Sequence, residues 1–388
     1  MKTLTFGGWY QRTTLHLSEV YRFLSDGTSN LELSKNKLKG FRDNLNLKSV
    51  KRHQGYLECI EIITNSGIIV RYYEDGLYVF TIKDTKDIKK DSEKLKKYFE
   101  EKWKPAIDYI FSLGAPTPKI LSNMKDNHPI VISTSVTSPR RLRLDDKMYG
   151  KTYAETLSKT AHVFKTTKYI MIAINKSHDK SLYDLIEMQI FFREFKLQLH
   201  KYLDIHRKIW EEIAEIKERK IIKGTEIGKE KSKLESYETT ISLIGNRINQ
   251  MTTYAKTRAS LAKKMGLEEN LISHFEYKHE DLLNSLEYIK EIWKMTKDYV
   301  SSALQVMRDL QGKTSTKGIK SIQLLASIGV VTGLVRYANT SSLQKIDIWG
   351  IIYIVSLALV AFGLDLFMKW NAGHKEYKLK FRERDTEL

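Results

Sequence analysis

Apolar residues in the C-terminal third of the chain form two long stretches separated by a short polar turn. The second stretch, 348–368, carries only one charge, Asp365. The first stretch, 319–337, is interrupted by serine, glutamine and threonine. A helix that crosses a bilayer needs about 20 mostly apolar residues. The pattern therefore predicts a transmembrane hairpin over 318–370; the alternative is a helical hairpin buried inside a protein core.

Apolar residues upstream of this hairpin recur at alternating steps of four and three. Nine consecutive positions, which we call the seam, follow this rule without a break: Leu282, Leu286, Ile289, Trp293, Thr296, Val300, Ala303, Met307 and Leu310. A repeat of 3.5 residues is typical of helices packed as in a coiled coil. It predicts a stalk helix that begins at Glu268 and leads to the first apolar stretch. Gln311–Lys320 has two glycines and few apolar residues, so the sequence leaves open whether this segment is a hinge or a break between two helices. The seam would pack against other helices of this chain or of further copies.

The N-terminal half alternates strands with a helix. Strands are predicted at Tyr56–Ile63, Gly67–Tyr73, Gly76–Ile82, Pro129–Ser135 and Tyr169–Asn175, with a charged helix at Asp91–Leu113. The sequence Glu74-Asp75-Gly76 is a turn signal that joins two of the strands into an antiparallel meander. From Ser181 onward, apolar residues have helical spacing only.

These patterns predict an α+β membrane protein with four parts. Residues 1–180 form a cytoplasmic α/β domain, and 181–317 form an antiparallel long-helix bundle with the stalk helix. The transmembrane hairpin spans 318–370, and 371–388 form a basic cytoplasmic tail.

Charge sets the expected location. Lysine and arginine total 65 against 47 acidic residues, a net charge of +18, and basic residues crowd both outer flanks of the hairpin. The positive-inside rule then places both termini in the cytoplasm and the hairpin in the inner membrane. The lone Cys59 excludes an internal disulfide and fits a reducing compartment.

An α/β region, a long stalk helix, an apolar hairpin and a basic tail together resemble the CorA family of divalent-cation channels. The resemblance implies a homopentamer in the membrane lipid, with the first span lining the pore. In that family the first span ends in Gly-Met-Asn, and this chain has Tyr337-Ala338-Asn339 instead. Counting back from Asn339, the resemblance implies this pore lining: Thr316, Ile319, Ser327, Val330, Leu334 and Asn339. The stalk register continues instead on a neighbouring face: Ser321, Leu324, Ile328, Val331 and Val335.

Three arginines after a predicted strand are the candidate ligand-binding residues. Arg140, Arg141 and Arg143 follow Ser138-Pro139, and guanidinium groups bind phosphate as planar, two-pronged donors. The alternative is an ordinary solvated face. With the resemblance, they predict a pentameric channel gated by an anionic or nucleotide messenger, similar to CorA-like effectors of type III CRISPR defence.

Two other functions stay open: an ordinary Mg²⁺ transporter, and a membrane-tethered scaffold that conducts nothing. Acidic residues of the stalk are interleaved with lysines, which is typical of a solvated helix rather than a Mg²⁺ sensor. A divalent cation such as Mg²⁺ is the cofactor that the resemblance allows, and no histidine pair has the spacing of metal ligands. Familiar catalytic and nucleic-acid-binding motifs are missing, so neither an enzyme nor a nucleic-acid partner is expected.

Overall fold

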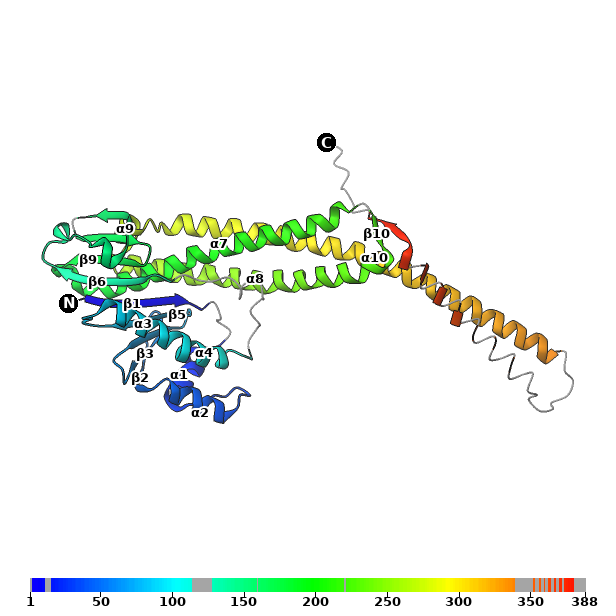
Figure 1. Cartoon of the computed structure of the whole chain (residues 1–388), viewed down its shortest axis with the longest axis horizontal. Helices are drawn as coiled ribbons and strands as arrows, with labels where there is room; N and C mark the ends of the chain where they lie inside the picture. The colour runs from blue at the N-terminus through cyan, green and yellow to red at the C-terminus, as the bar shows by residue number, and fades with distance from the viewer. Residues whose placement is uncertain are drawn as a thin grey trace, which may run out of the picture. The chain divides into compact units, whose positions relative to one another are not determined.

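The computed structural model describes the backbone of residues 2–10, 15–113, 128–158, 160–219 and 221–338, then separate positions between 352 and 371, and 373–379. Side chains within these ranges are described except at 178–180, 313–328 and 330–338. Contacts divide the chain into two units (labels below as in Figure 1). The first unit is Met1–Ile205 with Leu243–Ile292, and the second is His206–Ser242 with Trp293–Leu388.

The first unit is built on a nine-stranded sheet whose strand order is β2-β3-β4-β5-β1-β6-β9-β8-β7. Its strands are β1 (Lys2–Trp9), β2 (Leu47–His53), β3 (Cys59–Thr64), β4 (Ile69–Tyr73), β5 (Leu77–Ile82), β6 (Ile130–Val136), β7 (Thr152–Leu157), β8 (Ala161–Thr166) and β9 (Tyr169–Asn175). The meander predicted from alternating residues is confirmed as β3, β4 and β5. β1 then joins this meander to β6, pairing antiparallel with β5 on one side and β6 on the other.

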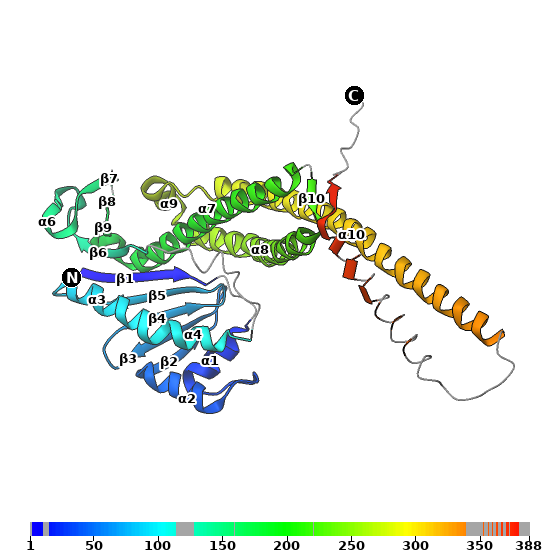
Figure 2. The same ribbon diagram turned by 45° about the vertical axis from the view of Figure 1, so that its right-hand side comes forward.

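Short helices cover one face of this sheet. They are α1 (Leu17–Asp26), α2 (Lys35–Asn44), α3 (Ile88–Tyr98), the π-helical turn η1 (Phe99–Trp103) and α4 (Lys104–Ile110). Figure 2 shows α3 and α4 lying across the strands. Their apolar side chains form one core with the sheet, in which Trp103 is fully buried and its ring lies 5.4 Å from that of Phe80. Burial of such large aromatic surfaces is the main force that holds the layers together.

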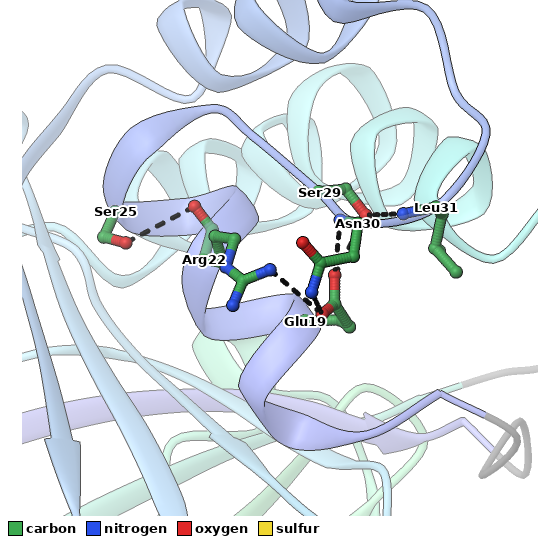
Figure 3. Close-up of polar contacts among 6 residues, drawn as sticks. All are labelled: Glu19, Arg22, Ser25, Ser29, Asn30 and Leu31. Atoms are coloured by element: carbon green, nitrogen blue, oxygen red, sulfur yellow. Dashed lines mark hydrogen bonds and ion pairs between the residues drawn. The ribbon is translucent and has the colours of Figure 1, made fainter.

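Glu19 fixes the loop between α1 and α2 (Figure 3). Its carboxylate accepts the Asn30 backbone N–H at 2.9 Å, the Asn30 side-chain amide at 3.0 Å and the Ser29 hydroxyl at 3.1 Å. Arg22, one turn along α1, adds an ion pair at 3.4 Å. The bond from Asn30 is the largest cause that lowers the pKa of Glu19, so the folded loop favours the ionised carboxylate.

The long helix α7 (Leu182–Glu218) covers the opposite face of the sheet with its N-terminal part. The Phe191 ring lies 5.1 Å from that of Trp9 on β1, and Ile190 packs against Gly7. A methyl group at Gly7 would lie 2.7 Å from the Tyr78 carbonyl oxygen and 3.2 Å from Ile190. The close approach of helix and strand therefore requires glycine at this position.

The other α-helices in the described part of the chain are α6 (Asp146–Tyr149), α8 (Gly224–Lys264), α9 (Glu268–Phe275) and α10 (His279–Ala338). The short strand β10 (Ile221–Lys223) pairs with β11 (Glu376–Lys378). The change to helix alone after Ser181 is confirmed for the long helices. The stalk helix does not begin at Glu268 as predicted, and α10 continues without a break through 311–320 to Ala338. Glu276 takes a left-handed conformation with φ of 60°, which ends α9 before α10 begins.

Within the second unit, side chains of α7 and α10 stack on each other. The Trp210 and Tyr299 rings lie 4.6 Å apart with 17° between their planes, and the Lys217 ammonium lies 4.4 Å from the centre of the Tyr299 ring. α8 reaches the same helix through a hydrogen bond of 2.9 Å from Lys231 to Gln311. The helices of this unit thus pack as a bundle.

All nine seam positions are buried within a single chain, from Leu286 at 0% exposure to Leu282 at 8%. The seam is therefore satisfied by helices of its own chain, one of the two packings open from the sequence. Its apolar surface gives no separate reason for copies to associate. The predicted homo-oligomer stays a prediction.

The predicted transmembrane hairpin is wrong. Among the described residues, no helix is both long enough and apolar enough to cross a membrane. The first apolar stretch is the end of α10, where the densely apolar run from 322 to 335 is shorter than a bilayer requires. Most of the second stretch lies outside the described residues. The finding overturns the membrane-protein fold class, the classification as a membrane ion channel and the inner-membrane location.

Candidate functional site

Two neighbouring strands of the first unit, β6 and β9, run parallel, so their carboxyl ends lie side by side at one end of the sheet. β6 and β9 pair from Ile130 with Tyr169 to Val136 with Asn175. The chain leaves β6 into the 3-10 turn η2 (Pro139–Arg141) and leaves β9 into the 3-10 turn η3 (Lys176–Ser181). Ligands of α/β proteins bind at the carboxyl ends of parallel strands. The carboxyl ends of β6 and β9 are therefore a candidate ligand site.

Residues 139–143, here called the arginine turn, alternate between buried and exposed. Pro139 is buried, and Leu142 is half-buried against the core of the sheet. Arg140, Arg141 and Arg143 are all exposed. Leu142 has extended backbone angles, with φ of −68° and ψ of 133°. Since successive side chains of an extended chain point to opposite sides, Leu142 anchors the segment while its two arginine neighbours project away from the core.

The arginines of this turn have no partner within the described part of the chain: no ion pair or hydrogen bond joins their side chains to another described residue. Seven other described arginines pair with a carboxylate: Arg22, Arg42, Arg52, Arg71, Arg193, Arg219 and Arg258. Three exposed arginines close together in the sequence, with no counter-ion among the described residues, favour a local positive potential. They keep all their donors available for an anion.

His162 holds the turn from the sheet side. It lies on β8 with 1% of its side chain exposed, and its Nδ1 is 3.0 Å from the Pro139 carbonyl oxygen. Its Nε2 is 2.6 Å from a carboxylate oxygen of Glu155 on β7. The same Pro139 oxygen accepts the Leu142 N–H at 3.1 Å, which closes the 3-10 turn. The arginines thus sit on a segment fixed by both apolar and polar contacts.

A second group of charged side chains lies in the interior of the first unit. Arg258 on α8 is 1% exposed, and its Nε and Nη2 lie 2.6 and 3.0 Å from the two carboxylate oxygens of Asp75. Its guanidinium also lies 4.5 Å from the centre of the Tyr73 ring and 5.3 Å from that of Phe191. Burial alone would lower the pKa of Arg258, but Asp75 raises it, so the guanidinium stays charged.

The interior group continues from Tyr73. Its hydroxyl donates to Glu187, which also accepts Arg71 Nη1 at 3.2 Å, and Arg71 Nε donates to Glu61 at 3.0 Å. Burial raises the pKa of Glu187, and Arg71 partly offsets this. Burial also raises the pKa of the nearby Cys59 thiol to about 12, which leaves it unreactive. Every charge here is paired inside the protein, so this group joins helices to sheet and does not form a ligand site.

The predicted pore-lining residues belong to α10 or follow it in the chain. Thr316, Ile319, Ser327, Val330 and Leu334 belong to the backbone of α10, but their side chains are outside the described set. Asn339 lies outside the described residues altogether. The structure therefore does not test the pore lining. No three His, Cys, Asp or Glu side chains in the described ranges are arranged to hold a metal ion.

Sequence reasoning found the three arginines but missed the contacts that hold them. His162 lies 23 positions after Pro139 in the sequence, and no local motif links the two residues. Residues 161–166 do not alternate between apolar and polar, so the sequence gives no clear strand signal there; in β8, His162 and Phe164 lie on one side of the strand. Only the sheet topology shows that this side meets Pro139.

Comparison with models of known protein families, with curated proteins and with solved structures finds no significant match. The resemblance to the CorA family is therefore untested and stays a prediction.

Proposed function

We propose that the protein binds a phosphate-bearing small anion, of which a nucleotide is the expected class, at Arg140, Arg141 and Arg143. The observation that supports this most is the absence of any described partner for these three exposed arginines. Arginine is the preferred side chain for two-pronged recognition of phosphate, because its planar fork matches two phosphate oxygens. The location at the carboxyl ends of β6 and β9 adds to the argument.

The fixed backbone of the arginine turn supports the same function. A flexible arginine loses conformational freedom when it binds, which lowers affinity. Here the backbone between Pro139 and Leu142 is closed by its own hydrogen bond and tied to His162. Only the side chains remain to be ordered by the anion, so the site is largely preformed. Charge-assisted hydrogen bonds then contribute on the order of 1.5–3 kcal/mol each.

The test is calorimetric titration of the purified protein with ATP and, separately, with pyrophosphate. Arg141→Gln should weaken binding by about tenfold or more, because it removes at least one charge-assisted bond. Arg141→Lys keeps the charge but not the fork, and should fall between Gln and the unchanged protein. Arg308→Gln is the matched control, since Arg308 is exposed and lies in the second unit.

Pyrophosphate has phosphate groups but no base or sugar, so comparing it with ATP shows which part of the nucleotide the arginines bind. Equal loss of ATP and pyrophosphate binding in Arg141→Gln would place the phosphates on the arginine turn. Binding that is unchanged in the combined Arg140→Gln, Arg141→Gln and Arg143→Gln protein would overturn the proposal, as would no binding of either anion to the unchanged protein.

A further inference from the structure

Glu155 on β7 is an acidic side chain close to the backbone of the arginine turn. One of its carboxylate oxygens lies 2.6 Å from Nε2 of His162, and Nδ1 of the same ring lies 3.0 Å from the Pro139 carbonyl oxygen. A single imidazole ring therefore separates this carboxylate from the turn. His162 is 1% exposed, so close packing around the ring fixes the positions of the two groups that contact it.

The carboxylate of Glu155 keeps one side open to a ligand. Its side chain is 49% exposed, and its second oxygen has no hydrogen bond or ion pair to another described residue. None of the three arginines of the turn forms an ion pair with it. Glu155 therefore keeps acceptor capacity of its own, and the arginine donors stay available for phosphates.

Leu157 adds an apolar surface on the same face of the sheet. In the pairing of β7 with β8, Leu157 lies opposite His162. Glu155 lies opposite Phe164, whose ring is 4.0 Å from that of His162. Directly opposite residues of an antiparallel pair point to the same face. Leu157 is also 49% exposed, so this face presents a carboxylate and an accessible apolar side chain together.

A carboxylate close to a phosphate site restricts which phosphates are bound well. It repels inorganic phosphate and pyrophosphate, because like charges at short range raise the energy. It favours a ligand that carries hydrogen-bond donors next to its phosphates, since a carboxylate can only accept. The hydroxyl groups of ribose are donors of this kind, and acidic side chains bind them in nucleotide sites. The apolar face of a base can in turn cover Leu157.

We propose that the arginine turn, Glu155 and Leu157 form one ribonucleotide site, in which Glu155 accepts a hydrogen bond from a ribose hydroxyl. The inference rests on the proposed function, because the arginines would bind the phosphates of the same ligand. It adds the chemical feature that separates this ligand from other phosphates, which is a ribose with its hydroxyl groups free and a base against Leu157.

The experiment is calorimetric titration of the full chain with ATP, 2′-deoxyATP, 3′-deoxyATP and pyrophosphate. The unchanged protein should bind at least one deoxy analogue about tenfold more weakly than ATP, the scale of one hydrogen bond to a charged group. The decisive quantity is the ratio of the affinities for ATP and for that analogue. A variant that only disturbs the turn weakens all nucleotides together and leaves this ratio unchanged.

Variants of Glu155 test its role directly. Glu155→Ala removes the acceptor, so the ratio should fall close to one. Glu155→Gln keeps an acceptor without the charge and should give an intermediate ratio. Pyrophosphate has no hydroxyl of this kind, so neither change should weaken its binding. Asp146→Ala is the matched control, because Asp146 is an exposed acidic residue between the turn and β7 in the chain.

Two further variants separate the parts of the site. Leu157→Ala should weaken the binding of all three nucleotides but leave pyrophosphate unchanged, since only the nucleotides have a base. Arg141→Gln should weaken all four ligands and leave the ratio of ATP to its deoxy analogue unchanged.

The outcomes distinguish the two proposals. Equal affinity of the unchanged protein for ATP and both deoxy analogues would overturn the role of Glu155, and a loss in Arg141→Gln would then leave the anion site standing. This comparison needs no variant of Glu155, so it holds even if Glu155→Ala does not fold. A ratio that persists in Glu155→Ala would also overturn the role of Glu155 alone. No binding of any of the four ligands to the unchanged protein would overturn both proposals.

Discussion

The buried pair of Arg258 and Asp75 allows a stability effect to be worked out from the structure. Arg258→Met keeps much of the side-chain volume but removes both bonds to Asp75, at 2.6 and 3.0 Å. Asp75 is 0% exposed and would keep only the Leu77 N–H, at 3.1 Å. Removing one partner of a buried ion pair costs about 3–5 kcal/mol, because the other charge is left without compensation. Loss of the contact with the Tyr73 ring adds to this cost.

Hydrogen exchange at the β4–β5 turn is the appropriate assay. Since the chain has two units, global unfolding need not be a single transition, whereas exchange reports the first unit alone. The Leu77 N–H donates to Asp75, so its protection depends directly on this turn. A loss of 3 kcal/mol corresponds to roughly 100-fold faster exchange. Arg219→Met is the control, since that arginine is 46% exposed and its pair with Glu230 should contribute less than about 1 kcal/mol.

A double-mutant cycle decides whether the pair or the packing is responsible. Asp75→Asn combined with Arg258→Met removes both charges and keeps an oxygen for Leu77. It should cost less than the sum of the two single changes by about 2 kcal/mol or more. If the two costs instead add within about 0.5 kcal/mol, the charges are not coupled and the reasoning is refuted.

Three further changes test the fold. Gly76→Ala should cost more than about 3 kcal/mol by thermal melting, because φ is 86° and the new methyl would lie 1.9 Å from the Tyr10 carbonyl oxygen; a cost below about 1 kcal/mol would contradict this. Glu19→Gln should cost about 1–2 kcal/mol in urea unfolding at pH 7. That cost should disappear as pH falls below the ordinary pKa of 4.5, because the folded pKa is lowered; a difference that does not change with pH would argue against the lowered pKa. Trp210→Ala should speed exchange in α10 of the second unit by removing about 2 kcal/mol of stacking and burial against Tyr299, whereas Tyr299→Phe should not; equal effects would exclude the stack.

Several elements could be predicted from sequence because their signals are local. Alternating residues marked β3, β4 and β5, and the Asp75-Gly76 turn between two of them is confirmed by the positive φ of Gly76. Helical spacing marked α7, α8 and α10 over many turns. In each case the residues that set the pattern are neighbours in the chain, so the period of the pattern directly reports the geometry.

Other elements depended on distant partners. β1 contains Gly7 and Gly8 and has a weak strand pattern, yet it is the central strand that joins the meander to β6. Its conformation is stabilised by pairing with β5 and β6 and by Ile190 of α7. Intrinsic strand preference counts for less than this burial on both faces. The alternation from Thr3 to Phe6 is short and is followed by two glycines, so the place of β1 in the sheet follows only from these pairings.

The apolar stretches led to the one large error. Hydropathy measures how apolar a segment is, but it does not say what covers that segment. A run near the length limit reads the same whether lipid or protein surrounds it. Apolar length alone therefore does not establish a membrane span.

By itself the sequence determined the secondary structure of strongly periodic segments and the presence of three clustered arginines, because both are properties of neighbouring residues. Tertiary structure decided the order of strands, the burial of the seam within one chain, and the contact of His162 with Pro139. These depend on pairings between residues far apart in the chain. Such pairings form only when the free energy of burial and hydrogen bonding exceeds the entropy lost in closing long loops, and no short window of sequence contains that balance.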